Sequence, residues 1–185
     1  MKKLFIILIV LALVSSLTIG CAKNKEQQNT AHEPEQPQQQ EVQFVEKQIV
    51  LFFPDKGNNF LLHEFRKVTV NKDISGENLA KIVLEELVKG TDNTELKSII
   101  PRSTKILSIK LENSVATIDF SEEFAADNYT NKEKLLQVFS VVNSISELGI
   151  QKISITVKGK PINEYYTFLK QQMPFSRNDD LIPSK

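Results

Sequence analysis

The chain has 185 residues, of which 23 are Lys or Arg and 23 are Asp or Glu, so its formal net charge at pH 7 is zero. A protein that binds nucleic acid or anionic lipid through many phosphate contacts carries a basic surplus. The balanced charge therefore argues against a nucleic-acid partner and against a polybasic attraction to membranes. The sequence contains one cysteine, Cys21, which excludes a disulfide within the chain.

The N-terminal segment has the layout of a secretory signal. Lys2 and Lys3 precede an unbroken apolar run from Leu4 to Val14. As a helix this run spans only about 16 Å, whereas the hydrocarbon core of a bilayer is about 30 Å thick. A cleaved signal peptide over residues 1–20 is therefore favoured over a retained transmembrane helix.

The leader ends in Leu17-Thr18-Ile19-Gly20-Cys21, which resembles the bacterial lipobox, although Thr18 stands where a Leu is usual. The resemblance implies that Cys21 is acylated and that the chain is cleaved on the amino side of Cys21. The acylated cysteine would then anchor the protein in membrane lipid on the extracytoplasmic face of the cell membrane. Each buried methylene contributes ~0.8 kcal/mol, and stable anchoring takes more than one acyl chain. The alternatives are an unmodified cysteine in a discarded leader and a free thiol that pairs between molecules.

A polar stalk is expected to follow the anchor. Residues 22–41 contain no large apolar side chain, so they cannot bury enough surface to offset the entropy of ordering. A flexible coil of this length spans roughly 25 Å on average. We therefore divide the chain into a lipidated cysteine and stalk over 21–43, a folded domain over 44–178, and a tail over 179–185.

The domain is expected to begin with two strands, over 45–53 and 60–70, joined by a loop that contains Pro54. In the second strand the apolar alternation changes phase between Phe65 and Val68. A one-residue change of phase is typical of a bulge or a break in the strand.

Two amphipathic helices are predicted from three- and four-residue apolar spacing. The first covers 75–89, with Ser75 as its N-cap and Gly90 as its stop. The second covers 130–148 and begins with a capping box formed by Thr130 and the glutamate three residues later.

The remaining segments complete the order β-β-α-β-β-α-β. Residues 96–101 favour a short helical turn, residues 105–120 favour a β-hairpin, and residues 153–157 favour a last strand. This order predicts an α+β fold in which two amphipathic helices pack on one face of a mainly antiparallel sheet.

Five segments carry a resemblance to a known family when they are taken in this order: Leu51–Asp55, Val83–Gly90, Ile100–Leu107, Val115–Phe124 and Val141–Ser144. Together they resemble the GerMN domain, which is named after the spore germination protein GerM, over residues 49–178. The resemblance implies a small α+β domain on lipoproteins and membrane-attached proteins of the bacterial envelope, some of which carry two copies and act in sporulation and germination. This chain has room for one copy, and the family offers no catalytic residues to carry over.

A few acidic residues and one histidine of the domain are weak candidates for catalysis. Asp119, Glu122 and Glu123 lie close together and could serve acid–base chemistry on a glycan. The alternation of the strand turns Asp119 away from the core, and the two glutamates suit a helix start, so we favour a structural role for all three. His63 is expected to be an exposed strand residue, and neither a metal nor a cofactor is predicted.

Four aromatic residues, Phe52, Phe53, Phe60 and Phe65, are candidates for a partner surface. Successive residues of a strand point to opposite faces, so Phe52 and Phe53 cannot both face a one-sided core. We therefore expect a non-enzymatic module that binds an envelope protein or its own copies. The alternative is a cell-wall-associated lipoprotein that binds a ligand or hydrolyses its substrate.

Overall fold

The first two strands form a hairpin with a continuous register. The computed structural model describes residues 42–126, 128–169 and 173–184. β1 (Phe44–Pro54) pairs antiparallel with β2 (Leu61–Asn71) along its whole length, and no bulge interrupts the pairing. The bulge or break that was expected in the second strand is therefore wrong.

The change of phase in β2 has a different cause. Glu64 and Arg66 occupy the face of the hairpin that also carries Val68, while Phe65 lies on the opposite face. Two charged residues thus interrupt an apolar face, and an aromatic residue interrupts a polar one. The strand stays regular because the two charges pair with each other and Arg66 also donates hydrogen bonds to the end of the next helix.

α2 (Gly76–Lys89) begins and ends where the sequence predicted. The hydroxyl of Ser75 accepts a hydrogen bond from the N–H of Asn78. Gly90 has a φ of 86°, which lets the chain leave the helix while its N–H donates to the carbonyl of Glu86. The buried stripe of α2 packs against β1 and the first strand of the second sheet.

The second sheet has four strands in the order β3-β4-β5-β6, with only β4 and β5 parallel. The predicted hairpin over 105–120 is confirmed, and its turn is made by Asn113 and Ser114, which have φ angles of 50° and 64°. The strands are β3 (Ile106–Glu112), β4 (Val115–Phe120), β5 (Lys152–Val157) and β6 (Lys160–Pro161).

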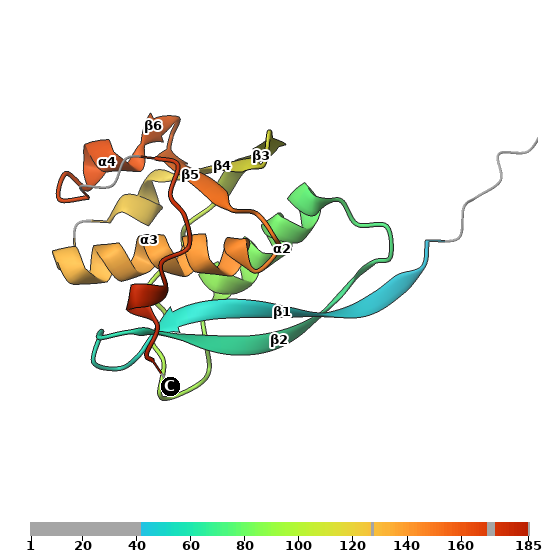
Figure 1. Cartoon of the computed structure of the whole chain (residues 1–185), viewed down its shortest axis with the longest axis horizontal. Helices are drawn as coiled ribbons and strands as arrows, with labels where there is room; N and C mark the ends of the chain where they lie inside the picture. Colours follow the sequence, from blue (N-terminus) through green and yellow to red (C-terminus); the bar gives the residue numbers. More distant parts are fainter. Residues whose placement is uncertain (1–41, 127, 170–172, 185) are drawn as a thin grey trace, which may run out of the picture. The chain divides into compact units, whose positions relative to one another are not determined.

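α3 (Asn131–Ser146) lies between the two sheets and contacts β1 on one side and β5 on the other (Figure 1). Its predicted capping box is present, with the side chain of Thr130 accepting from the N–H of Glu133. The α+β class and the order of the elements are confirmed. The helices cover the inner face of the four-stranded sheet, and the hairpin forms a separate, second sheet on their other side.

Every residue of α3 from Leu136 to Ile145 is buried, including several polar ones. Gln137 donates to the carbonyl of Phe124 at 3.0 Å. Asn143 forms two hydrogen bonds with the backbone of Asn178, at 3.1 and 3.0 Å. These side chains attach irregular segments to the helix that the two sheets enclose.

Short elements complete the domain: η1 (Glu122–Ala125), α4 (Ile162–Tyr165) and η2 (Asp179–Leu181). The helical turn that was expected over 96–101 is wrong. Leu96 forms an isolated bridge with Asp55, and the N–H of Lys97 donates to the carbonyl of Pro54 at 2.9 Å. No helical turn forms because the backbone of Leu96 and Lys97 pairs with the end of β1.

Asn143→Ala is expected to destabilise the domain by about 1–3 kcal/mol, because it leaves the N–H and carbonyl of Asn178 without partners. Ser140→Ala is the matched control, since Ser140 is equally buried on α3 and its hydroxyl has no hydrogen-bond partner among the described residues. Its free energy of unfolding should be unchanged or raised. Urea denaturation of both variants measures the difference, and equal losses would contradict this assignment.

Candidate functional site

The four candidate aromatic residues fall into two pairs. Phe52 and Phe53 are 3% and 1% exposed and belong to the core, so the expectation that they line a partner surface is corrected. Phe60 and Phe65 are 42% and 58% exposed. A partner surface on Phe60 and Phe65 remains a prediction.

Both faces of the hairpin are covered near Phe52 and Phe53. The expectation that only one face of this strand is buried was therefore wrong. Phe53 lies on the face that packs toward the helices, and the guanidinium of Arg66 is 6.0 Å from the centre of its ring. The ring of Phe52, on the other face, lies 5.1 Å below the guanidinium of Arg177. The segment near the C-terminus thus buries an aromatic residue that the strand pattern turns outward.

Phe65 lies on the outer face of the hairpin, opposite Val50. Its ring meets the imidazole of His63 edge to face, with 5.0 Å between the ring centres. His63 is exposed, as expected. This face therefore presents an aromatic pair to the solvent.

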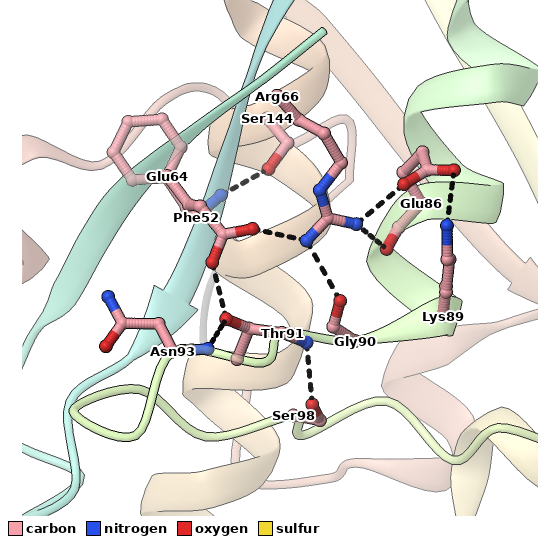
Figure 2. Close-up of polar contacts among 10 residues, drawn as sticks. All are labelled: Phe52, Glu64, Arg66, Glu86, Lys89, Gly90, Thr91, Asn93, Ser98 and Ser144. Carbon is pink, nitrogen blue, oxygen red and sulfur yellow. Dashed lines mark hydrogen bonds and ion pairs between the residues drawn. The ribbon is translucent and has the colours of Figure 1, made fainter. Parts of the chain in front are cut away.

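On the inner face of the hairpin, Arg66 is the centre of a polar cluster at the C-terminal end of α2 (Figure 2). Its guanidinium donates to the carboxylate of Glu86 at 2.7 Å, to the carbonyl of Gly90 at 3.0 Å and to the carboxylate of Glu64. The hydroxyl of Thr91 donates to the second oxygen of Glu64. Burial opposes the charge of Arg66, but the hydrogen bonds that Arg66 donates to Glu86 and Glu64 outweigh this effect and raise the pKa of Arg66.

A hollow of about 460 Å³ adjoins this cluster, with Arg66 and Glu64 in its wall. Lys89, Asp92 and Arg102 add charges of both signs to its lining. Sequence reasoning missed this cluster, although the interrupted alternation of β2 was its signal. The hydrogen bonds of Arg66 are directed at the protein itself, which makes the cluster a clamp between β2 and α2.

The carboxylates that favoured an enzymatic alternative have structural partners. Asp119 accepts hydrogen bonds from the hydroxyl of Thr156 at 2.7 Å and from the N–H of Gly159 at 2.8 Å. Glu122 pairs with Lys158 at 2.6 Å. A hydrogen bond from Ser121 lowers the pKa of Glu123. Asp119 and Glu122 thus hold the end of β4 to the turn after β5, whereas Glu123 is bound within its own segment.

The predicted lipidation site, Cys21, and the stalk as far as residue 41 lie outside the described residues. Within the part of the chain that the structure describes, no helix is both long enough and apolar enough to cross a bilayer. Over the same residues, no group of three His, Cys, Asp or Glu side chains is placed to hold a metal ion.

The sequence model of the Germane family, described as "Sporulation and spore germination", matches residues 50–163. This match spans more than half of the 185 residues. The chain belongs to the Germane family. The resemblance to the GerMN domain that the sequence predicted is confirmed.

Three solved structures share the fold of this Germane domain. A candidate lipoprotein from Clostridium perfringens is 20% identical with a TM-score of 0.51, and the match covers 76% of this chain and 93% of that one. The tandem GerMN domains of the sporulation protein GerM from Bacillus subtilis are 21% identical with a TM-score of 0.54, covering 72% and 46%. The first GerMN domain of that protein is 24% identical with a TM-score of 0.50, covering 71% and 96%. No curated protein sequence matches the chain.

The residues that carry the family resemblance hold the Germane domain together. The carboxylate of Asp55 accepts hydrogen bonds from the N–H groups of Asn59 and Phe60 and so closes the loop between β1 and β2. Burial opposes the charge of Asp55, but these backbone N–H groups outweigh it and lower its pKa. At the other end of the motif, Asn143 and Ser144 bind backbone groups of the C-terminal segment and of β1.

Arg66→Met should lower the free energy of unfolding by about 2–3 kcal/mol, because Glu64 would remain partly buried without its cation and Glu86 would keep only the exposed Lys89. Lys67→Met is the matched control on the next residue of the strand. Lys67 forms a 3.0 Å pair with Glu46 that is largely exposed, so its loss should cost less than about 0.5 kcal/mol. If chemical denaturation gave the same loss of unfolding free energy for both variants, Arg66 would not act as a clamp between β2 and α2.

Glu133 should make the domain sensitive to acid. The N–H and hydroxyl of Thr130 lower the pKa of Glu133, and Lys97 adds to this effect. A lowered pKa contributes stability that is present above the unfolded-state pKa and is lost as the pH falls through the folded-state value. Glu133→Gln should therefore be less stable than the parent near pH 7, and the difference should shrink below about pH 4. Denaturation curves between pH 2 and 7, with Glu85→Gln on the exposed side of α2 as control, test this.

Proposed function

We propose that this chain is a lipid-anchored protein of the bacterial envelope whose Germane domain assembles with other proteins and performs no chemistry. The observation that carries the proposal is the family match over residues 50–163. Its description names sporulation and spore germination, and two of the related structures come from a sporulation protein. The biological setting that we propose is therefore the envelope of a cell that forms or germinates spores.

The lipid anchor is supported by the sequence and by one relative. Cys21 follows a basic and apolar leader in a lipobox-like segment, and a relative that shares the fold is described as a candidate lipoprotein. A stalk of about 20 residues would hold the domain roughly 25 Å from the lipid headgroups. That separation leaves the domain free to meet other proteins at the outer face of the membrane.

A non-catalytic role is supported by the way the charged side chains are used. Asp119 is bound by Thr156 and Gly159, and Glu122 is bound by Lys158. A glycosidase needs two carboxyl groups that face one substrate across about 5–10 Å. The hydrolytic alternative gains no support from these carboxylates, because their hydrogen bonds join segments of the domain to each other.

Replacing Cys21 tests the anchor directly. In cells that express the full chain, Cys21→Ser should abolish labelling by a fatty-acid probe and leave the leader uncleaved. The lipobox resemblance implies that the thiol is acylated first and that the leader is cleaved afterwards. Mass spectrometry of the mature parent protein should find an acylated N-terminal cysteine. A parent protein that matures without acylation would contradict the proposed anchor.

Crosslinking in intact membranes, followed by purification of the full chain, tests assembly. We expect either an envelope protein or further copies of this chain in the crosslinked material. A chain that remains monomeric in light scattering and captures no protein would refute a role in assembly.

A further inference from the structure

The outer edge of β2 carries a row of backbone groups that point away from the protein. The N–H of Phe52 donates to Ser144 of α3, so it points away from β2, and its pairing partner His63 likewise directs its backbone away from β1. Backbone directions alternate along an antiparallel pair, so Phe65, Lys67 and Thr69 direct theirs outward as well. Among the described residues, these outward groups of β2 meet no hydrogen-bond partner.

Each of the other sheet edges is protected over at least part of its length. α3 covers the edge of β1 at Phe52, where Ser144 accepts its N–H at 2.9 Å. An irregularity in register interrupts β3 near Ser108, and Glu77 accepts the N–H of Leu111 at 2.9 Å. β6 contains only two residues. Proteins commonly block sheet edges by these devices, because an open edge is a template for another strand.

The side chains of β2 match those of the β2 strand of a second copy when the two strands run antiparallel and Phe65 lies opposite Phe65. Glu64 then faces Arg66 of the second copy, and Leu62 faces Val68 of the second copy. The two Phe65 rings face each other, and the pairing of His63 with Lys67 adds nothing favourable. Both halves of a two-fold interface thus avoid like acidic or basic pairs at Glu64 and Arg66, which are already neutralised within their own copy, and bring apolar side chains together.

We infer that the outer edge of β2 binds the same edge of a second copy of this chain and joins the two hairpins into one four-stranded sheet. This inference deepens the proposed assembly function and rests on it. It also accounts for an aromatic side chain that is 58% exposed in the middle of a regular strand. Copies tethered to one membrane would meet at a raised effective concentration, which favours a contact of modest size.

Other alignments of the strand are less favourable. A centre at Glu64, Arg66 or Lys67 would place a charged residue opposite its own copy, and like charges in this position are destabilising. Pairing through the edge of β1 meets the same problem at Glu46 and Lys47. The centre at Phe65 avoids every such pair and keeps the charged neighbours complementary.

Phe65→Cys in the full chain tests the contact. Cα atoms of a hydrogen-bonded antiparallel pair lie about 5.5 Å apart, which suits a disulfide. Oxidation in intact membranes should therefore yield a covalent dimer. The same change at Thr69 should not, because two Thr69 residues would lie about 27 Å apart along the strand direction. Phe44→Cys, on β1 and 67% exposed, is the second control.

Association without a crosslink gives an independent measurement. In detergent-solubilised full chain, Phe65→Lys should raise the dissociation constant of the dimer by about tenfold or more, because it replaces an aromatic pair by two like charges. Phe44→Lys should leave the constant unchanged. Both positions are exposed, so circular dichroism should show folded protein for both variants.

The outcomes separate this inference from the proposed function. Two results would overturn the β2 contact and leave the proposed assembly intact. One is a disulfide-linked dimer of Thr69→Cys or Phe44→Cys but not of Phe65→Cys, and the other is a dissociation constant that Phe65→Lys does not change. Capture of a different envelope protein by a chain that never pairs with itself would do the same. A strict monomer without any captured protein would overturn both.

Discussion

The enclosure of α3 between two sheets is the constraint on which the rest of the domain depends. A helix buried on every side offers its polar side chains no water, and a buried polar group without a partner costs several kcal/mol by transfer estimates. Gln137, Asn143 and Ser144 meet this demand by binding backbone groups of other segments. The helix therefore fixes η1, the end of α4, the C-terminal segment and the edge of β1, because each of them contains a hydrogen-bond partner of these side chains. Tyr166, directly after α4, is one such partner, because its hydroxyl donates to the side chain of Gln137 at 2.8 Å.

This arrangement makes the two strands of the hairpin unequal. β1 lies next to α3 and is covered near Phe52 by the helix and by Arg177. β2 is held from one face only, through the clamp that joins Arg66 to the end of α2. Its outer edge and its outer face are left to the solvent. The same contacts that stabilise the domain thus determine which strand remains available to another molecule.

The sequence predicted the elements that depend on local chemistry. Ser75, Gly90 and the capping box at Thr130 delimit helices through contacts within a few residues, so both long helices lie close to their expected positions. Division of the strands into two sheets was not predicted, because apolar periodicity does not show which strand pairs with which. The non-helical path of residues 96–101 was missed for the same reason, since it follows from pairing with the distant end of β1.

The structure separates the four aromatic residues of the predicted partner surface, and a surface on Phe60 and Phe65 stays a prediction. The exposed positions of Phe60 and Phe65 agree with a partner surface, whereas Phe52 and Phe53 are core residues. Burial of Phe52 requires Arg177, which lies 125 positions further along the chain and carries no local signal of that contact. The clamp at Arg66 did leave a signal in the interrupted alternation of β2. A bulge and a buried ion cluster produce the same pattern, and only the position of Glu86 distinguishes them.

Residues that hold a domain together through backbone contacts leave its surface free to vary. Asp55, Asn143 and Ser144 bind N–H or carbonyl groups, which every residue type provides, so their partners are free to change identity. Solved structures only 20–24% identical to this chain keep the same fold. Relatives that share the fold are then free to differ on β2, where the side chains face the solvent. The partner surface that we propose for this chain therefore lies on the exposed strand rather than on the residues that carry the family resemblance.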